Sequence, residues 1–168
     1  MKIKKSYTST LLAFVCNLTM VYLVYGICRL AYLFENWSVL SAGFDTLSFW
    51  EVFKGCWMFD TSAILYTNAL YAVMMLFPFH FKETNFWQSV AKWVFVVVNT
   101  ICIVANLVDV VYFQYTGRRT TSSVFSEFSH ESNLAGVFGV ELLHHWYLVL
   151  LGLLLIAVLI FLYVKPKK

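Results

Sequence analysis

The sequence predicts an all-α membrane protein: a polytopic bundle of four transmembrane helices, with short amphipathic interfacial helices on its outer side. Of the 168 residues, 61% are hydrophobic and only 12% are charged, whereas a soluble domain has about 25% charged residues. The charges are clustered, and long apolar runs separate the clusters. Helices are favoured over other spanning structures because the lipid core offers the backbone no other hydrogen-bond partner. This composition excludes a soluble enzyme, and no nucleic-acid partner is expected.

Four uncharged apolar runs supply the predicted spans, because runs of about 18 or more such residues are long enough to cross a bilayer. One run has only 16 residues between Lys92 and Asp109, so it requires Lys92 to snorkel and Asp109 to be tolerated in the membrane. Lysines precede the first run, but its apolar part exceeds the roughly 7–15 residues of a signal peptide. The chain is therefore expected to form one transmembrane domain, 1–168, with spans near 8–32, 59–78, 86–112 and 142–164.

The distribution of lysine and arginine predicts the orientation. With the N-terminus in the cytoplasm, eight basic residues lie inside and four lie outside, which agrees with the positive-inside rule. Four spans then return the C-terminal Lys165–Lys168 to the cytoplasm. The outer basic residues are Arg29, Lys54, Arg118 and Arg119.

Two outer connections are expected to form amphipathic helices at the membrane surface. In 44–58, Asp45 or Ser48 is a candidate cap for a short helix, and its aromatic residues suit the interface, where tryptophan is enriched. In 121–141, apolar residues recur at roughly helical spacing, which is typical of one or two helices lying on the outer leaflet.

Polar residues inside the predicted spans are the first candidate site. In 86–112, Asn99, Asn106 and Asp109 share one helical stripe with Cys102. Asp60 opens the span 59–78, and Asn68 follows it. A carboxylate within a membrane helix is a functional hypothesis by default, but polar side chains also bond across helices as structural contacts. Both interpretations remain open for these residues.

Arg118 and Arg119 follow the third span and are the candidate binding site for lipid phosphate. Three roles are open to the pair: an ion pair with Asp109 or Asp60, a fork that binds phosphate, or a marker of the headgroup boundary. No phosphate-binding loop, nucleophile elbow or paired-carboxylate motif is present. Adjacent His144 and His145 lack the i, i+4 spacing of helical metal ligands. No catalytic residue, metal ligand or cofactor is therefore assigned within this chain.

Two stretches carry a resemblance to a known family. FDTSAILYTNALYAVMMLFPF (59–79) and NLVDVVYFQYTGRRTTSSVFSEFSHESN (106–133) resemble the N-terminal membrane domain of the lipoteichoic acid synthase-like family. This family comprises phosphoglycerol transferases and sulfatase-like proteins of the alkaline phosphatase superfamily. The similarity is greatest to the versions found in Bacteroides-type bacteria, and it extends over nearly the whole chain.

The resemblance implies a bacterial inner-membrane protein and a role as the anchor of an enzyme. Family members have five membrane helices followed by an extracellular catalytic domain, which transfers a phospholipid headgroup and uses a divalent metal, usually manganese. This chain ends after its fourth predicted span, so the fifth helix and the catalytic domain are expected to be missing. The implied partners are anionic phospholipid headgroups and a catalytic domain supplied in cis or in trans.

Two other functions remain open from the residues alone. One is a stand-alone four-helix protein that acts as an assembly or regulatory subunit. The other is a small transporter, for which polar residues at mid-membrane in several spans would be expected; here the acids lie near one predicted face.

Overall fold

The computed structural model describes residues 2–44, 48–77, 84–117, 140–141 and 143–166. Six helices have defined bounds within these ranges, and the same ranges contain no strand. The predicted all-α class is therefore confirmed for the described residues. Helices lie at all four predicted spans, but the span 59–78 is divided between two helices that meet at Asn68. The helices are α1 (Lys2–Glu35), α2 (Trp37–Phe44), α3 (Phe49–Thr67), α4 (Ala69–Leu76), α5 (Asn85–Thr116) and α8 (Trp146–Phe161).

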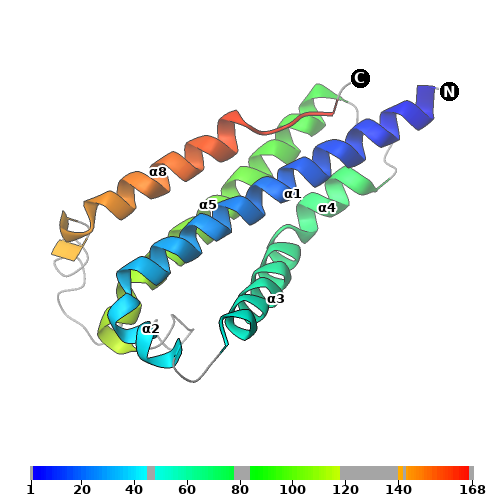
Figure 1. Cartoon of the computed structure of the whole chain (residues 1–168). Coiled ribbons are helices and arrows are strands. Elements are labelled where there is room, and N and C mark those ends of the chain that lie inside the picture. The colour runs from blue at the N-terminus through cyan, green and yellow to red at the C-terminus, as the bar shows by residue number, and fades with distance from the viewer. Residues whose placement is uncertain (1, 45–47, 78–83, 118–139, 142, 167–168) are drawn as a thin grey trace.

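The long helices α1 and α5 lie side by side and make the most extensive helix contact in the bundle. α8 packs mainly on α5, whereas α3 and α4 follow α1 on its other side (Figure 1). The beginning of α1 and the segment after α8 lie at the same end of the bundle (Figure 1). We call this end the terminal end, and we call the opposite end, where α2 connects to α1 and where α8 begins, the α2 end.

Two of the helices are long and apolar enough to cross a membrane. They are the 28-residue part of α1 from Thr8 to Glu35 and the 32-residue α5. At about 1.5 Å per residue, each exceeds the roughly 30 Å of a bilayer core. A buried core helix of a soluble protein can be equally long and apolar. In each of these two helices, however, only 33% of an 18-residue apolar stretch is buried. α8 is apolar as well, with 16 residues.

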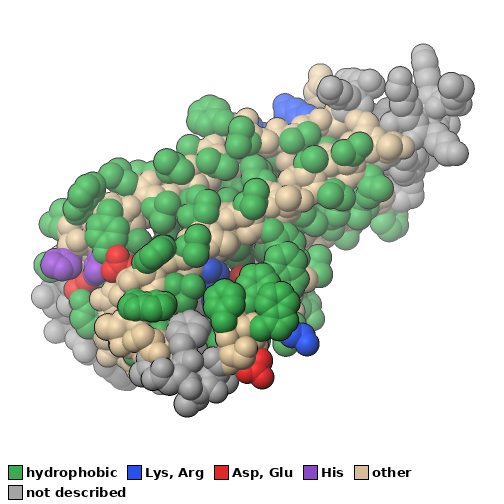
Figure 2. Space-filling view, viewed as in Figure 1, with side chains coloured by type: hydrophobic (Ala, Val, Ile, Leu, Met, Phe, Trp, Pro, Cys, Tyr) green, Lys and Arg blue, Asp and Glu red, His purple; other side chains and the backbone are tan. Residues whose placement is uncertain are grey.

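The described surface is mainly apolar. Figure 2 shows hydrophobic side chains along the sides of the bundle, with most of the visible charged groups near its ends. Large residues such as Leu23, Leu153 and Phe161 are 65%, 60% and 83% exposed. Large exposed apolar patches are unusual on soluble monomers. This surface suits a lipid environment.

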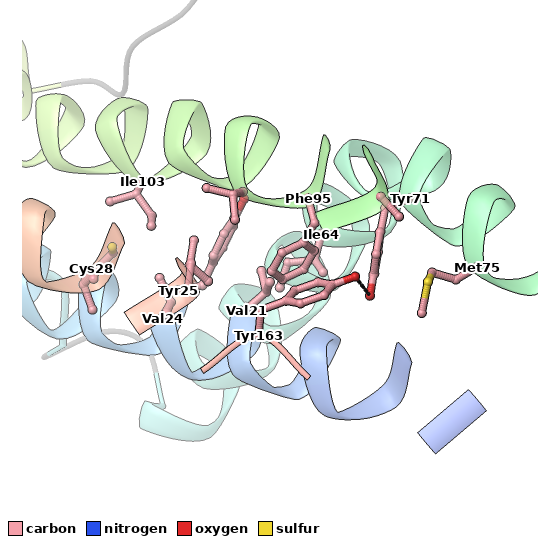
Figure 3. Close-up of a cluster of buried hydrophobic side chains, with 14 of the residues drawn as sticks. Val21, Val24, Tyr25, Cys28, Ile64, Tyr71, Met75, Phe95, Ile103 and Tyr163 are labelled. Carbon is pink, nitrogen blue, oxygen red and sulfur yellow. Dashed lines mark hydrogen bonds between the residues drawn. The ribbon is translucent and has the colours of Figure 1, made fainter. Parts of the chain in front are cut away.

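The core combines side chains from α1, α3, α4, α5 and α8 with Tyr163 from the segment after α8. Figure 3 shows Tyr71, Phe95 and Tyr163 gathered at one part of this core. The Tyr71 and Phe95 ring centroids are 4.9 Å apart, and those of Phe95 and Tyr163 are 5.6 Å apart. The tilted arrangement of these rings is one that aromatic pairs prefer.

One predicted boundary is wrong. The sequence predicts a separate surface segment over 44–58 and a span that begins at residue 59, but residues 49–58 belong to the continuous helix α3. Ser48 is the predicted cap, and it forms a capping box in which its own N–H donates to the carboxylate of Glu51. The helix then continues without a break to Thr67 because no residue between these points interrupts it. Asp45 and nearly all of 121–141 lie outside the described residues.

The end of α5 is defined by a glycine. Gly117 has φ 63°, and its N–H donates to the carbonyl of Phe113. This left-handed conformation is the usual way for a helix to end at glycine, which has no Cβ to clash there. The chain therefore leaves the axis of α5 immediately before Arg118 and Arg119, both of which lie outside the described residues.

The close contact between α5 and α8 leads to a prediction. A Cβ at Gly152 would lie 2.9 Å from Cδ1 of Leu107. Gly152→Ala should be nearly neutral, because the Leu107 methyl group can move and alanine favours a helix. Gly152→Leu should lower the free energy of unfolding by about 1–2 kcal/mol through overpacking. Gly26→Leu is the matched control, since a Cβ at Gly26 meets nothing within 4 Å. Equal unfolding curves for the two leucine variants would contradict the predicted packing.

Candidate functional site

Several polar side chains lie buried in the interior of the bundle, beside its hydrophobic core. Asn17, Asn68 and Asn99 are each at most 2% exposed, and Asp109 is 4% exposed. Large apolar residues also cover much of the outside, and exposed apolar surface together with buried polar groups is unusual for a soluble protein. The buried polar groups between the two ends form three contacts between helices: an ion pair, an amide pair and an anchor for the segment after α8.

The ion pair joins α1 to α3. Nε of Arg29 donates to both carboxylate oxygens of Asp60, at 3.2 and 3.1 Å, and Nη2 donates to Oδ1. The two side chains are only 21% and 14% exposed. Paired donors of this kind give arginine–carboxylate contacts both strength and a fixed geometry. Figure 2 shows a basic and an acidic side chain together between α1 and α3, within an otherwise apolar face.

Asp109 adds a second acid to this region. It lies on α5, and its charge acts on Arg29 together with that of Asp60. Arg29 therefore experiences carboxylates from two different helices, α3 and α5. Near the same level, Nδ2 of Asn36 donates to the carbonyl of Val110 at 3.0 Å and so joins the end of α1 to α5.

The structure gives Asp60 a partner that the sequence did not select. Arg29 bonds both oxygens of this carboxylate, whereas Arg118 and Arg119, whose roles were left open, lie outside the described residues. The signal for Arg29 was present in the sequence. It is the one charged residue between Lys5 and Glu35, and a lone arginine within an apolar helix requires an acid nearby.

The amide pair joins the α3–α4 junction to α5. Nδ2 of Asn99 donates to Oδ1 of Asn68 at 2.8 Å, and Nδ2 of Asn68 donates back to Oδ1 of Asn99 at 3.2 Å. Each Nδ2 also donates to a carbonyl of its own helix, that of Phe95 or Ile64. Asn68 lies where α3 ends and α4 begins. The pair therefore joins the break between these two helices to the continuous helix α5.

This pair predicts a coupled mutational effect. Asn68→Leu and Asn99→Leu should each lower the free energy of unfolding by about 1–2 kcal/mol, because each leaves the other amide without its partner in an apolar interior. The double variant should cost less than the sum of the two, and unfolding in mixed micelles measures the difference. Additive losses would show that the two amides do not depend on each other.

Asn106 plays a smaller part than the sequence suggested. Its Nδ2 donates to the carbonyl of Cys102 at 2.9 Å, which lies one turn earlier on the same helix. The predicted stripe on α5 is buried at Asn99 and Asp109 but only half-buried at Cys102 and Asn106. The inward-facing part of the stripe therefore lies at its two ends, at Asn99, which bonds Asn68, and at Asp109.

The third contact anchors the segment that follows α8. Oδ1 of Asn17 accepts from the N–H of Val164 at 2.9 Å, and Nδ2 donates to the Val164 carbonyl at 3.0 Å and to the Tyr71 hydroxyl at 2.8 Å. Tyr71 in turn contacts the hydroxyl of Tyr163 at 3.5 Å, the dashed line in Figure 3. Nζ of Lys92, which was expected to snorkel, lies 5.9 Å from the centroid of the Tyr163 ring, within cation–π range.

Within the described ranges, no group of three or more histidine, cysteine or acidic residues is arranged to hold a metal ion. The four cysteines are free thiols. The contacts in the interior hold helices together, and none of them combines a nucleophile with a base.

Comparison of the chain with protein-family models, with curated proteins and with solved structures gave no match.

Proposed function

We propose that this chain is the membrane domain of a lipoteichoic acid synthase-like phospholipid headgroup transferase. In this proposal it holds a catalytic domain, in cis or in trans, at the outer surface of a bacterial inner membrane. The observation that carries the membrane part is the apolar exterior of the bundle, together with paired polar side chains in its interior. The catalytic part rests on the resemblance of residues 59–79 and 106–133 to that family.

The proposal includes four spans, with α1 and α5 as two of them. The third is α3 with α4, which cross together despite the break at Asn68. The backbone at the break remains bonded, because the N–H of Asn68 donates to the Ile64 carbonyl and the N–H of Ala72 donates to the Asn68 carbonyl. Such bonding is what the lipid core requires of an interrupted helix. The fourth span is α8 with its flanking residues, which together approach the thickness of the bilayer core.

The terminal end faces the cytoplasm in this proposal, and the α2 end faces outward. Arg29 and Asp60 then hold α1 to α3, and Asn36 holds the end of α1 to α5, in the outer half of the membrane. There they would give the outer connections a rigid base. Arg118 and Arg119 follow α5 directly, so they would lie at the headgroups, where an arginine fork suits lipid phosphate.

The size of the native product tests the proposal. Membranes of the source cell are blotted with an antibody against residues 1–20. A band several times larger than 19.5 kDa whose immunoprecipitate transfers headgroups supports a catalytic domain in cis. A 19.5 kDa band that brings down a separate transferase supports one in trans. A 19.5 kDa band with no associated transferase would contradict the proposal and favour a stand-alone subunit.

A further inference from the structure

A histidine and an acid face each other in the turn before α8, at the α2 end of the bundle. The N–H of His145 donates to the carbonyl of Glu141, so the two residues are one helical turn apart. Nε2 of His145 lies 3.5 Å from Oε2 of Glu141. Figure 2 shows histidine and acidic side chains together at this end. The three interior contacts do not include this pair, so its role is separate from theirs.

The facing oxygen of Glu141 has no hydrogen-bond partner. Its Oε2 is buried, and no donor among the described residues bonds it. Nε2 of His145, a residue only 7% exposed, is close to this oxygen, but the contact does not meet hydrogen-bond geometry. A buried carboxylate oxygen left in this way is costly unless a cation faces it. The position between Oε2 and Nε2 therefore suits a cation.

The remaining atom of each group is held by a tyrosine. The hydroxyl of Tyr115 on α5 donates to Oε1 of Glu141 at 2.9 Å. Nδ1 of His145 lies 2.9 Å from the hydroxyl of Tyr147. A histidine that binds a metal is usually oriented by a hydrogen bond at its other ring nitrogen, and a carboxylate that binds a metal is hydrogen-bonded as well. Both groups therefore have the outer contacts that are typical of metal ligands.

The distance between the two facing atoms fits two ligands of one metal ion. Zn²⁺ binds imidazole nitrogen at about 2.0–2.1 Å and carboxylate oxygen at about 2.0–2.2 Å. In tetrahedral coordination these bond lengths place the two ligand atoms about 3.3–3.5 Å apart, and Nε2 and Oε2 are 3.5 Å apart. A shared ion lies to one side of the line that joins its ligands. The alignment that a hydrogen bond needs is therefore not required for the ion.

We propose that Glu141 and His145 bind a divalent transition-metal ion with the ligand preference of Zn²⁺. Imidazole and carboxylate are both zinc ligands, whereas Ca²⁺ and Mg²⁺ prefer oxygen alone. His145 binds as the neutral imidazole through Nε2 and keeps its hydrogen on Nδ1, where the Tyr147 oxygen accepts it. The side chain of Glu141 is 27% exposed, so the ion can enter from the surface. Water completes the coordination, and the site is open rather than a closed structural site with four protein ligands.

Histidine NMR on the full, unmodified chain in mixed micelles tests the site. The ring nitrogens are labelled isotopically, and the spectrum of His145→Gln identifies which signals belong to His145. Titration with zinc chloride at constant pH should shift the Nε2 signal of His145 until the site is saturated, while Nδ1 keeps its hydrogen. His145 signals that do not change over the titration would overturn the proposal.

Variants distinguish a site made by the pair from binding at exposed histidines. Glu141→Gln keeps the shape and can still accept from Tyr115, but it removes the charge. The zinc concentration that gives half of the His145 shift should therefore rise about tenfold or more. Tyr147→Phe removes the hydroxyl that orients the ring and should weaken binding about tenfold. His144→Gln is the matched control, because His144 is adjacent and exposed, and it should bind zinc as the parent does.

The variants can also contradict the proposal. An unchanged zinc affinity in Glu141→Gln or in Tyr147→Phe would show that these groups do not form or orient the site. A weaker affinity in His144→Gln would show that exposed histidines bind the ion instead. These measurements need neither the proposed orientation nor a catalytic domain.

Discussion

Asp60→Asn is expected to destabilise the bundle strongly. It removes the charge that faces Arg29 but keeps the shape of the side chain. Breaking a buried ion pair from one side costs about 3–5 kcal/mol, and the lower end applies here because both groups retain some exposure. Reversible unfolding in mixed micelles should therefore show a loss of about 3 kcal/mol. Arg29→Lys, made with Asp60 intact, should keep little of the stability that the ion pair contributes, because an ammonium lacks the fork that bonds both oxygens.

Two controls distinguish the ion pair from a general effect of charge. Lys54→Gln removes an exposed charge from the same helix α3 and should change the stability by less than about 0.5 kcal/mol. Arg29→Met combined with Asp60→Leu removes both charges and should recover most of the loss, since a pair of apolar groups leaves no uncompensated charge. A double variant as unstable as Asp60→Asn would show that the charges themselves are not the cause.

Asn17→Ala is expected to release the segment after α8. The change removes the acceptor of the Val164 N–H and the donor to the Val164 carbonyl and to Tyr71. Because these hydrogen bonds surround a fully buried residue, their removal should lower the free energy of unfolding by about 3 kcal/mol. Hydrogen exchange at the Val164 amide reports the release directly, and the exchange should become at least tenfold faster.

Thr19→Ala is the matched control for this experiment. Thr19 lies on the same helix, but it is exposed and its hydroxyl donates to the carbonyl of Val15 one turn earlier. Its replacement should leave the exchange at Val164 unchanged. If Asn17→Ala also leaves that amide protected, then the side chain of Asn17 does not hold the segment after α8, and the packing of Tyr163 against Phe95 must hold it instead.

The positions of the helices followed from the sequence, because composition and charge spacing act locally. Uncharged runs identified α1 and α5, although α1 begins six residues before the predicted span. Ser48, one of the two candidate capping residues, forms the cap. The continuation of α3 through 49–58 was not predicted. In the sequence alone, the charged and aromatic residues of 49–58 have the pattern of a separate interfacial segment. The packing of α3 against α1, which shows them to be part of one helix, is not visible there.

The partners of the polar residues depended on tertiary structure. The sequence selected Asp60, Asn68, Asn99 and Asp109 as intramembrane polar residues, and these lie in the interior. It could not show that Asn68 pairs with Asn99, 31 positions away, because helix rotation and the break between α3 and α4 decide which faces meet. Asn17 and His145 were not selected as site residues. A lone asparagine and a histidine pair carry no spacing signal, and their roles come from Val164 and Glu141, brought close by the fold.

The most direct test of the central claim is whether α3 and α4 cross the membrane together. Phe49 at the start of α3 and Phe86 at the start of α5 are both strongly exposed, at 70% and 79%. Each is replaced by cysteine, one at a time, in a protein whose four native cysteines are changed to alanine. In intact spheroplasts a membrane-impermeant thiol reagent should label the cysteine at position 49, and it should label the one at position 86 only after lysis. Equal labelling of both positions before lysis would contradict a bundle in which polar pairs inside the membrane hold four crossings together.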